Sequence, residues 1–484
     1  MLKEILKPIK IGTPQGTRDF DAEVIAKRNY IFNIIKETFE LYGFQPLETP
    51  VMENLSILNG KYGDEGEKLI FKILNNGLTR KENLEKSKKG FAEFLEGKED
   101  LIVEKGLRYD LTIPLARYVA SNYNQLVMPF KRYQIQSVYR ADKPQKGRYR
   151  EFTQCDADII GTNSLLCEIE LINIYYDVFK KIGLDVDIRI NSRKLLTCLS
   201  ECFTNKFTQN DWKTSENQLC QIIDKLDKVG IDGVKNELIF LDYSSSEISF
   251  ILNFISLASS TKLNIELLDE IESTLKSYKN IPKSLTEAIN ELRPILELFG
   301  DKVKFDPSLA RGLNYYTGLI FEIKSNSVEI GSLGGGGRYD NLTSQFGTKT
   351  STIFCPGIGI SFGVERIYEV MSQLSLFNMV KVPTSKILFF NMGDVEIKTS
   401  LILASKLRSE GISCEIYTDK LTFDKQFKYA DKKKIPFIAI VGSNELKNGT
   451  CIIKDMNSRD QKIVEQAKLP TTFKSILINK GYTF

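Results

Sequence analysis

The chain has 484 residues, of which 42% are hydrophobic and 26% are charged, and its formal net charge is +4. This length favours two or three domains, and this composition is that of an ordinary soluble globular protein. The sequence contains no histidine, which excludes Ser-His-Asp triads, histidine general bases and most transition-metal sites. Any chemistry must therefore rely on Asp, Glu, Arg, Lys, Tyr and the backbone.

The cysteines and the lengths of the apolar segments indicate the cellular compartment of the protein. Eight cysteines are scattered without a C-x-x-C pair, which is typical of reduced thiols in a cytosol. Cys198 and Cys202 lie one helical turn apart, but no second pair or histidine accompanies them, so we interpret them as packing residues. No apolar run approaches the ~18–20 residues that span a bilayer, and the N-terminus lacks the apolar stretch of a signal peptide. We therefore expect a cytoplasmic protein without a membrane partner.

The first part of the chain mixes helix and strand patterns. Residues 22–42 carry apolar side chains at helical spacing, and a strand interrupted by Pro50 follows. Residues 79–105 are rich in Lys and Glu and predict a solvated, partly mobile insertion. Residues 128–161 contain two alternating β runs around a polar loop, which predicts an antiparallel hairpin with a long basic tip. Residues 163–182 predict an amphipathic helix.

The rest of the chain changes character twice. Residues 195–300 are helix-patterned with no glycine loops, and they predict a helical insertion domain between the two parts of a core, 1–194 and 301–376. Strand-like, glycine-rich sequence returns after this insertion. From Pro383, strands and helices alternate at about 10–15 residue spacing, which predicts a small α/β domain over 384–484 with a largely parallel sheet.

The hairpin carries a cluster of basic side chains that suits a polyphosphate, because guanidinium groups bind phosphate oxygens bidentately. The alternative is a basic loop that is merely solvated, or one that is paired with Asp142 and Glu151. The basic residues are Arg132, Arg140, Lys143, Lys146, Arg148 and Arg150.

Polar side chains continue along the second strand of the hairpin. Gln154, Asp156 and Asp158 recur with period two and so share one face of a strand. Three polar residues on one strand face beside an arginine cluster are unusual for a core. The alternative is the solvent-facing side of a sheet.

Three further segments attract attention. Asp110 and Thr112 share a face of a predicted strand that Pro114 ends, although an Asp-x-Thr pair alone does not specify a site. The run Gly334–Gly337 is not followed by G-K-[ST], so it is no Walker loop, and it predicts close backbone approach to a ligand or another strand. A later glycine-rich strand leads into a helix with Arg366 in its first turns, where its charge and the helix dipole favour an anion.

Two adjacent tyrosines, Tyr315 and Tyr316, stand where a loop becomes an apolar strand, in the stretch DPSLARGLNYYTGLIFEI from Asp306. Successive strand residues face opposite sides. We therefore predict that the two rings do not share one core pocket and that at least one of them serves a purpose besides packing.

The order of these segments resembles the catalytic core of class II aminoacyl-tRNA synthetases, and more closely the histidyl-tRNA synthetase family. The resemblance covers nearly the whole chain, and R-G-L-x-Y-Y-T-G is highly specific to this family and its close paralogues. It implies an α+β core in which an antiparallel sheet is flanked by helices, with a helical insertion and a C-terminal α/β anticodon-binding domain. The motifs are TPQGTRDF (13–20), LRYDLTIPLARY (107–118), VYRADKPQKGRYREFTQCDADIIG (138–161), LARGLNYYTGLIFE (309–322), GGGRYDNL (335–342) and GIGISFGVERI (357–367).

The resemblance also implies roles for individual residues. Arg311 matches the family's catalytic arginine, and it acts with Arg140. The positions that match ATP contacts are Arg140, Arg148, Glu151 and Arg366. The positions that match the histidine site are Asp110, Thr112, Arg140, Gln154, Asp158, Arg311, Tyr315 and Tyr316. Two positions depart from the pattern, since Asn314 replaces a common Asp and Thr153 replaces an aromatic residue or His; neither change removes a reacting group.

The implied function is ATP-dependent ligation of L-histidine to tRNA(His) through a histidyl-adenylate, with ATP and Mg²⁺ as cofactors. The substrate carboxylate is ionised at pH 7, so it needs no general base to become a nucleophile. The segment around Pro50 implies a homodimer. The C-terminal domain would bind the anticodon, with Lys425, Lys428 and Lys432–Lys434 as phosphate contacts or as a solvated helix face. The alternative is a non-catalytic regulatory or sensor relative, against which the intact R-G-L-x-Y-Y-T-G and terminal domain argue.

Overall fold

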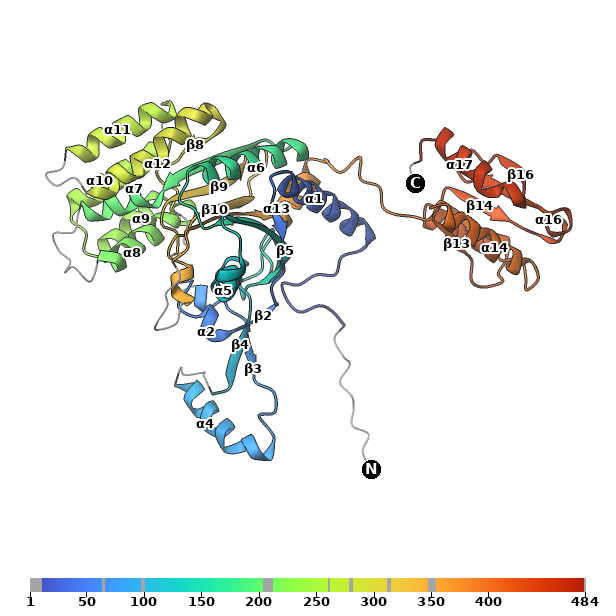
Figure 1. Ribbon diagram of the computed structural model, residues 1–484, viewed down its shortest axis with the longest axis horizontal. Helices are drawn as coiled ribbons and strands as arrows, with labels where there is room; N and C mark the ends of the chain where they lie inside the picture. Colours follow the sequence, from blue (N-terminus) through green and yellow to red (C-terminus); the bar gives the residue numbers. More distant parts are fainter. Residues whose placement is uncertain are drawn as a thin grey trace. The chain divides into compact units, whose positions relative to one another are not determined.

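The computed structural model of the chain divides into two compact units, Met1–Val380 and Lys381–Phe484, and each is described by itself (Figure 1). Arg311 and Asn314, two of the positions named above, lie outside the described residues. The structure describes residues 11–62, 66–96, 101–202, 212–259, 262–277, 282–310, 315–346 and 354–482.

The first unit is built on an eight-stranded sheet with the order β1-β5-β6-β11-β10-β9-β7-β8. The six central strands pair antiparallel, and each edge strand pairs parallel with its neighbour. The predicted hairpin and the expected antiparallel sheet flanked by helices are thus confirmed. The strands are β1 (Gln45–Pro46), β5 (Phe130–Tyr139), β6 (Glu151–Ile160), β7 (Val186–Ser192), β8 (Lys304–Phe305), β9 (Leu319–Ser325), β10 (Gly334–Arg338) and β11 (Gly357–Gly363).

Three helices pack against this sheet through a common hydrophobic cluster: α1 (Ala22–Leu41), α6 (Leu166–Ile182) and α13 (Val364–Gln373). The first two confirm the helices predicted from apolar spacing. The α1 helix begins where the Asp21 side chain accepts a hydrogen bond from the Val24 amide at 2.9 Å. The α6 helix ends at Gly183, whose φ of 78° is the left-handed conformation that favours glycine.

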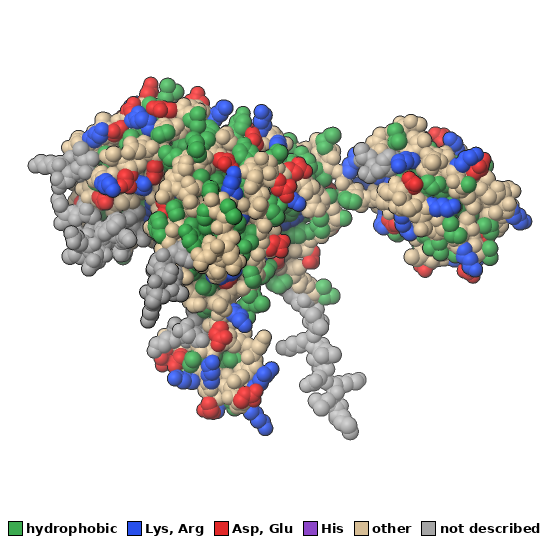
Figure 2. Space-filling model, viewed as in Figure 1, with side chains coloured by type: hydrophobic (Ala, Val, Ile, Leu, Met, Phe, Trp, Pro, Cys, Tyr) green, Lys and Arg blue, Asp and Glu red, His purple; other side chains and the backbone are tan. Residues whose placement is uncertain are grey.

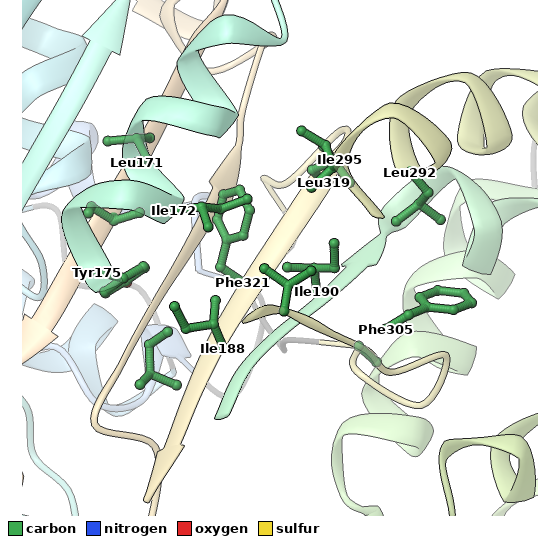
Figure 3. Packing of buried hydrophobic residues seen from close by; sticks show 14 of the residues in the cluster. Leu171, Ile172, Tyr175, Ile188, Ile190, Leu292, Ile295, Phe305, Leu319 and Phe321 are labelled. Atoms are coloured by element: carbon green, nitrogen blue, oxygen red, sulfur yellow. The ribbon is translucent and has the colours of Figure 1, made fainter. Parts of the chain in front are cut away.

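A set of helices occupies the predicted insertion and shares the hydrophobic cluster of the sheet. Figure 3 shows Leu292 and Ile295 beside Ile190 and Leu319, while Tyr175 lies on the α6 side of the same sheet. Fully burying such side chains stabilises the fold by about 1.5–3 kcal/mol each. The helices are α7 (Arg193–Glu201), α8 (Trp212–Asp224), α9 (Leu226–Phe240), α10 (Ser245–Ser256), α11 (Asn264–Lys276) and α12 (Lys283–Phe299).

A second hydrophobic cluster lies against the other face of the sheet, where it includes Ile160 of β6 and Ile320 of β9. It contains residues from two helices and from a small antiparallel sheet with the order β2-β4-β3. The elements of this region are β2 (Met52–Asn54), α2 (Leu55–Leu58), β3 (Lys72–Leu74), α4 (Leu84–Leu95), β4 (Val103–Leu107) and α5 (Thr112–Asn122).

The prediction for residues 79–105 was wrong in part, because this segment contains α4 and most of β4. Ser87 and Gly90 of α4 are buried, and Gly90 lies against Ile102. Lys and Glu are good helix formers, so a composition rich in both fits a solvated helix as well as an unstructured loop. Figure 2 shows Lys and Arg side chains interspersed with Asp and Glu around this helix.

The second unit is an α/β domain with a five-stranded sheet in the order β13-β12-β14-β15-β16. Its first three strands pair parallel, but β15 pairs antiparallel with both of its neighbours. The predicted alternation is confirmed, whereas the expectation of a largely parallel sheet was wrong. The elements are β12 (Ile387–Phe389), α14 (Glu396–Ser409), β13 (Cys414–Ile416), α15 (Phe423–Lys432), β14 (Phe437–Ile440), α16 (Ser443–Asn448), β15 (Thr450–Asp455), β16 (Gln461–Glu465) and α17 (Leu469–Asn479).

Among the helices of the described ranges, none combines the length and the apolar character that crossing a membrane requires.

Candidate active site

A row of polar side chains lies on one face of β5, β6 and β11. The strand register places Arg132 opposite Asp158 and Gln134 opposite Asp156, while Gly359 and Ser361 of β11 complete the two rows. The intervening residues of β6, Cys155 and Ala157, belong to the helix-covered cluster. The shared face of Gln154, Asp156 and Asp158 is therefore confirmed. Both aspartates are buried, so this is not the solvent-facing side of a sheet.

Arg132 and Asp158 form an ion pair at the centre of this face. The Arg132 Nη2 atom lies 2.8 Å from Asp158 Oδ2, and it donates to the Leu111 carbonyl at 3.2 Å. The Tyr339 hydroxyl donates to Asp158 Oδ1. Burial raises the pKa of Asp158, while Arg132 and Tyr339 act in the opposite direction. The carboxylate is thus held by the ion pair with Arg132 and the hydrogen bond from Tyr339, which come from two other segments of the chain.

Three buried polar groups beside this ion pair lack a full set of partners. The Oδ1 atom of Asp156, the Oε1 atom of Gln154 and the Nε and Nη1 atoms of Arg132 have no hydrogen-bond partner among the described residues. Burial raises the pKa of Asp156 to about 7, with Arg132 lowering it and Asp158 raising it further. Buried polar atoms are normally satisfied, so these atoms mark a place for a polar ligand or water.

Asp110 lies at the start of α5 rather than on a strand. It accepts a hydrogen bond from the Ile113 amide at 3.1 Å and from the Tyr62 hydroxyl at 3.0 Å. Burial raises its pKa. The prediction that Asp110 and Thr112 share a strand face was wrong, because Thr112 begins a helix. Pro114 occupies the first turn of that helix, where a missing N–H costs nothing.

Tyr315 and Tyr316 are both buried in the second cluster, and their ring centroids are 4.9 Å apart. The prediction that they do not share a pocket was wrong. They precede β9, which begins at Leu319, so strand alternation does not apply to them. Tyr315 donates to Asp110 Oδ2 at 3.5 Å, and its ring lies 6.1 Å from that of Tyr339. Tyr315 thus bonds to Asp110 and lies beside Tyr339, the tyrosine that bonds to Asp158.

The glycines of β10 and β11 form part of the floor of this site. A Cβ atom at Gly359 would overlap Asp158 Oδ1, and one at Gly337 would lie 2.8 Å from the Tyr316 ring. A Cβ at Gly336 would overlap the backbone of β11 at Gly359. The predicted close approach is confirmed for these strands, and any side chain here would displace the pocket residues.

The arginines of the hairpin make two separate sets of contacts. Arg140 donates from Nε to the Tyr109 carbonyl at 3.0 Å, and its guanidinium lies 4.2 Å from the centre of that ring. Arg148 instead donates to Asp142 at 2.8 Å. Arg148 is therefore paired with Asp142, which is the alternative to phosphate binding that the sequence left open. Glu151 is exposed and accepts from the Tyr139 hydroxyl at 3.3 Å.

Arg366 lies in the first turn of α13, as predicted, and reaches two loops. Its Nε atom donates to the Gly147 carbonyl at 3.1 Å and its Nη1 atom to the Ser332 carbonyl at 2.8 Å. These contacts tie the helix to the tip of the hairpin and to the segment before β10. The guanidinium is therefore oriented by two backbone carbonyl groups.

The neighbouring Glu365 is a buried anchor that the sequence analysis missed. It accepts from Arg18 and Arg28 at 2.6 Å each, and Arg28 also donates to the Thr153 hydroxyl at 3.1 Å. The presence of Arg18 in the motif TPQGTRDF was a signal, but its partner could not be read from spacing. The unusual Thr153 is thus a hydrogen-bond acceptor in this anchor. Tyr62 and Tyr339 were likewise not assigned to the site. Arg132 was counted with the basic cluster that suits a polyphosphate, but it is buried and paired with Asp158 instead.

The sequence of the chain matches family models and known proteins. A family model described as "Histidyl-tRNA synthetase" matches residues 103–367, and one described as "Anticodon binding domain" matches residues 388–476. The "Histidine--tRNA ligase" of Phocaeicola vulgatus is 45% identical over 96% of this chain and 99% of its own length. The protein of the same description from Bacteroides fragilis is 45% identical over 95% and 98%.

Solved structures agree with these sequence matches. The crystal structure of histidyl-tRNA synthetase from a Nostoc species superposes with a TM-score of 0.72 at 28% identity, and the alignment covers 97% of this chain and all of that one. An apo histidyl-tRNA synthetase from S. aureus, 19% identical, has the same fold with a TM-score of 0.65. The chain belongs to the histidyl-tRNA synthetase family.

Proposed function

We propose that the polar face of the large sheet activates histidine with ATP and that the chain then transfers the histidyl group to tRNA(His). Membership of the family makes the chain an enzyme that charges tRNA with histidine; the steps and the role of each residue are the proposal. The observation that carries it is a buried row of carboxyl and amide groups over a glycine floor, with Arg140 and Arg366 beside it. The proposal also includes the predicted domain boundaries: a core over 1–194 and 301–376, a helical insertion over 195–300 and an anticodon-binding domain over 384–484.

Histidine would bind where the carboxyl groups converge. Asp110, Thr112 and Gln154 would hold the α-ammonium group, since a carboxylate and an amide oxygen accept its N–H bonds. Asp158 would accept from the imidazole, and Tyr315 and Tyr316 would line the ring. The orphaned Oε1 of Gln154 supports this assignment, because it lacks a donor among the described residues.

ATP would lie over the glycine floor with its phosphates towards the arginines. Arg140, Arg148 and Arg366 would bind phosphate oxygens, and Arg148 would exchange its contact with Asp142 for a phosphate. Mg²⁺ usually binds one or two carboxylates plus phosphate oxygens, and the exposed Glu151 beside the hairpin fits that requirement. When bound, Mg²⁺ would supply further charge neutralisation at the phosphates.

The first reaction would be an in-line attack by the histidine carboxylate on the α-phosphorus of ATP, which forms the adenylate and releases pyrophosphate. Arg140 and Arg311 would stabilise the charge that builds on the α-phosphate oxygens. The terminal ribose hydroxyl of tRNA(His) would then attack the acyl carbon, and AMP would leave. No step requires a histidine side chain of the protein.

The second unit would bind the anticodon. Lys425, Lys428 and Lys432–Lys434 are exposed on and just after α15, where they could contact phosphates, although Lys433 is paired with Glu415 at 2.8 Å. A homodimer through the segment after Pro50 is also part of the proposal, and the exposed apolar side chains of Val51 and Met52 support it. A cytoplasmic location is likewise part of the proposal.

Two assays on the purified chain test this proposal. The first is amino-acid-dependent ATP–pyrophosphate exchange with each of the twenty amino acids, where only histidine is expected to support exchange. The second is charging of tRNA(His) against an unrelated tRNA. Exchange without charging would contradict the transfer step, and the absence of exchange with histidine would favour a regulatory or sensor role.

A further inference from the structure

Asp156 is a buried carboxyl group on the polar face for which the proposed reaction has no use. It lies on β6 between Gln154 and Asp158, 3% exposed, opposite Gln134 of β5 and Ser361 of β11. Its Oδ1 atom has no partner among the described residues, and the Nε and Nη1 atoms of the nearby Arg132 lack one as well. The Ser361 side chain hydrogen-bonds to the Asp156 carboxyl group, but no described residue supplies a partner for Oδ1. An unsatisfied buried carboxyl oxygen is costly, so this atom marks a place for a further partner.

We propose that Asp156 is a further histidine-recognition residue, and that Asp156 and Asp158 bind the two nitrogens of the imidazole ring from one strand face. This inference rests on the proposed function and adds a specificity-determining residue to it. The two carboxyl groups are two residues apart on β6 and therefore neighbours on the same face, with Arg132 opposite Asp158.

A neutral imidazole requires two different partners, because one ring nitrogen donates and the other accepts. Asp158 already receives hydrogen bonds or charge from Arg132 and Tyr339, which stabilise its carboxylate form as an acceptor. Among the described residues, Oδ1 of Asp156 has no donor, and burial raises the pKa of Asp156 to about 7. A carboxylic acid at Asp156 can donate its proton to the bare ring nitrogen, while Asp158 accepts from the ring N–H.

The charged and titratable groups around Asp156 are consistent with this division. Arg132 faces it from β5, Asp158 from its own strand and Asp110 from the loop before α5, while the Cys155 thiol points to the opposite side of the sheet. Two of the three facing groups are carboxyl groups. Arg132 offsets the charge of Asp156 and Asp158, while the charge that acts on Asp110 is that of Arg140. Two buried carboxylates beside one guanidinium cannot both stay ionised without cost, so a shared proton is expected before histidine binds.

The complex therefore retains a proton that free Asp156 loses as the pH rises above about 7. Histidine binding should take up most of one proton at pH 8, a pH at which the free imidazole is neutral. Calorimetric titration of histidine into the intact chain, in buffers of different ionisation heat, measures this uptake directly. The variant Asp156→Asn keeps a donor of the same shape but cannot titrate, so it should bind histidine without proton uptake.

Exchange kinetics provide the second measurement. The Asp156→Ala variant should raise the histidine KM by at least about 10-fold, because the ring nitrogen loses its donor, while the ATP KM stays unchanged. For Asp156→Asn, the histidine KM should stay within about 3-fold of wild type at pH 6.5 and should lose the rise that wild type shows above pH 7. Thermal denaturation of each variant verifies that it is folded.

The outcomes separate this inference from the proposed function. If wild type does not support exchange with histidine, both are wrong. If wild type is active but proton uptake is equal in wild type and Asp156→Asn, Asp156 does not contact the ring. Equal increases of the histidine and ATP KM values in Asp156→Ala would likewise overturn the inference and make Asp156 a structural residue, with water on its free oxygen.

Discussion

The carboxyl group of Asp156 should make the ligand-free protein less stable as the pH rises, and Asp156→Asn should remove this effect. Burial raises the pKa of Asp156 from 3.8 to about 7, so the folded state binds more protons than the unfolded state between these values. The free energy of unfolding therefore decreases with pH across this window. The penalty is absent below pH ~4 and complete above pH ~7. At about 1.4 kcal/mol for each pH unit it totals about 4 kcal/mol.

This penalty converts to a change in melting temperature. The first unit has 380 residues, and unfolding entropies of about 2.1 cal/mol/K per residue give about 0.8 kcal/mol/K for a unit of this size. Because about 2 kcal/mol of the penalty is already present at pH 5, the stabilisation by Asp156→Asn should increase by about 3 °C between pH 5 and pH 8. Differential scanning calorimetry at both pH values measures it.

A surface aspartate provides the control for this measurement. Asp185 lies in the same unit and is exposed, so Asp185→Asn removes one charge without relieving burial and should give a difference that does not depend on pH. If Asp156→Asn changes the melting temperature by the same amount at pH 5 and pH 8, the carboxyl group is not forced to remain protonated, and the reasoning from burial fails.

Four further predictions concern the site and the domains. Gly359→Ala should raise the histidine KM by about 10-fold or more, because its Cβ overlaps Asp158, whereas Gly12→Ala, which meets nothing within 4 Å, should be neutral; equal kinetics for both would refute the steric argument. Arg311→Ala should slow pyrophosphate exchange by roughly 10²-fold with little change in ATP affinity, and near-normal exchange would remove its catalytic assignment. Asp158→Asn should weaken histidine binding more than ATP binding, and an unchanged histidine KM would leave Asp158 a structural role. Removal of 384–484 should preserve exchange and impair charging, since no ATP or histidine residue in the proposal lies beyond Arg366; equal loss of both activities in a folded protein would contradict this division.

The sequence was most informative where one local rule decides the outcome. Period-two spacing placed Gln154, Asp156 and Asp158 on one face, and the glycine-rich strand before a helix placed Arg366 in its first turn. Both inferences need only the geometry of a single element. The first held because β6 keeps its type across the three residues, and the second because the motif predicts the change from strand to helix that occurs between β11 and α13.

Two of the wrong predictions arose where the type of element changes within a few residues. Pro114 suggested the end of a strand, but proline is also common in the first turn of a helix. Tyr315 and Tyr316 were read as part of a strand that begins only at Leu319. The Arg132–Asp158 ion pair and the Glu365 anchor could not be predicted from sequence, because their partners are distant in the chain and no spacing rule connects them.

The Glu365 anchor also has a consequence for the order in which the enzyme is made. Its partners Arg18 and Arg28 precede it by 347 and 337 residues, so the contact forms only after most of the first unit has left the ribosome. Long-range contacts of this kind fold slowly, because a large loop must close first. The hairpin and α1 can form early during synthesis, but the helix that carries Arg366 arrives last. In the proposed mechanism Arg366 binds ATP, so a nascent chain would stay inactive until α13 has been synthesised.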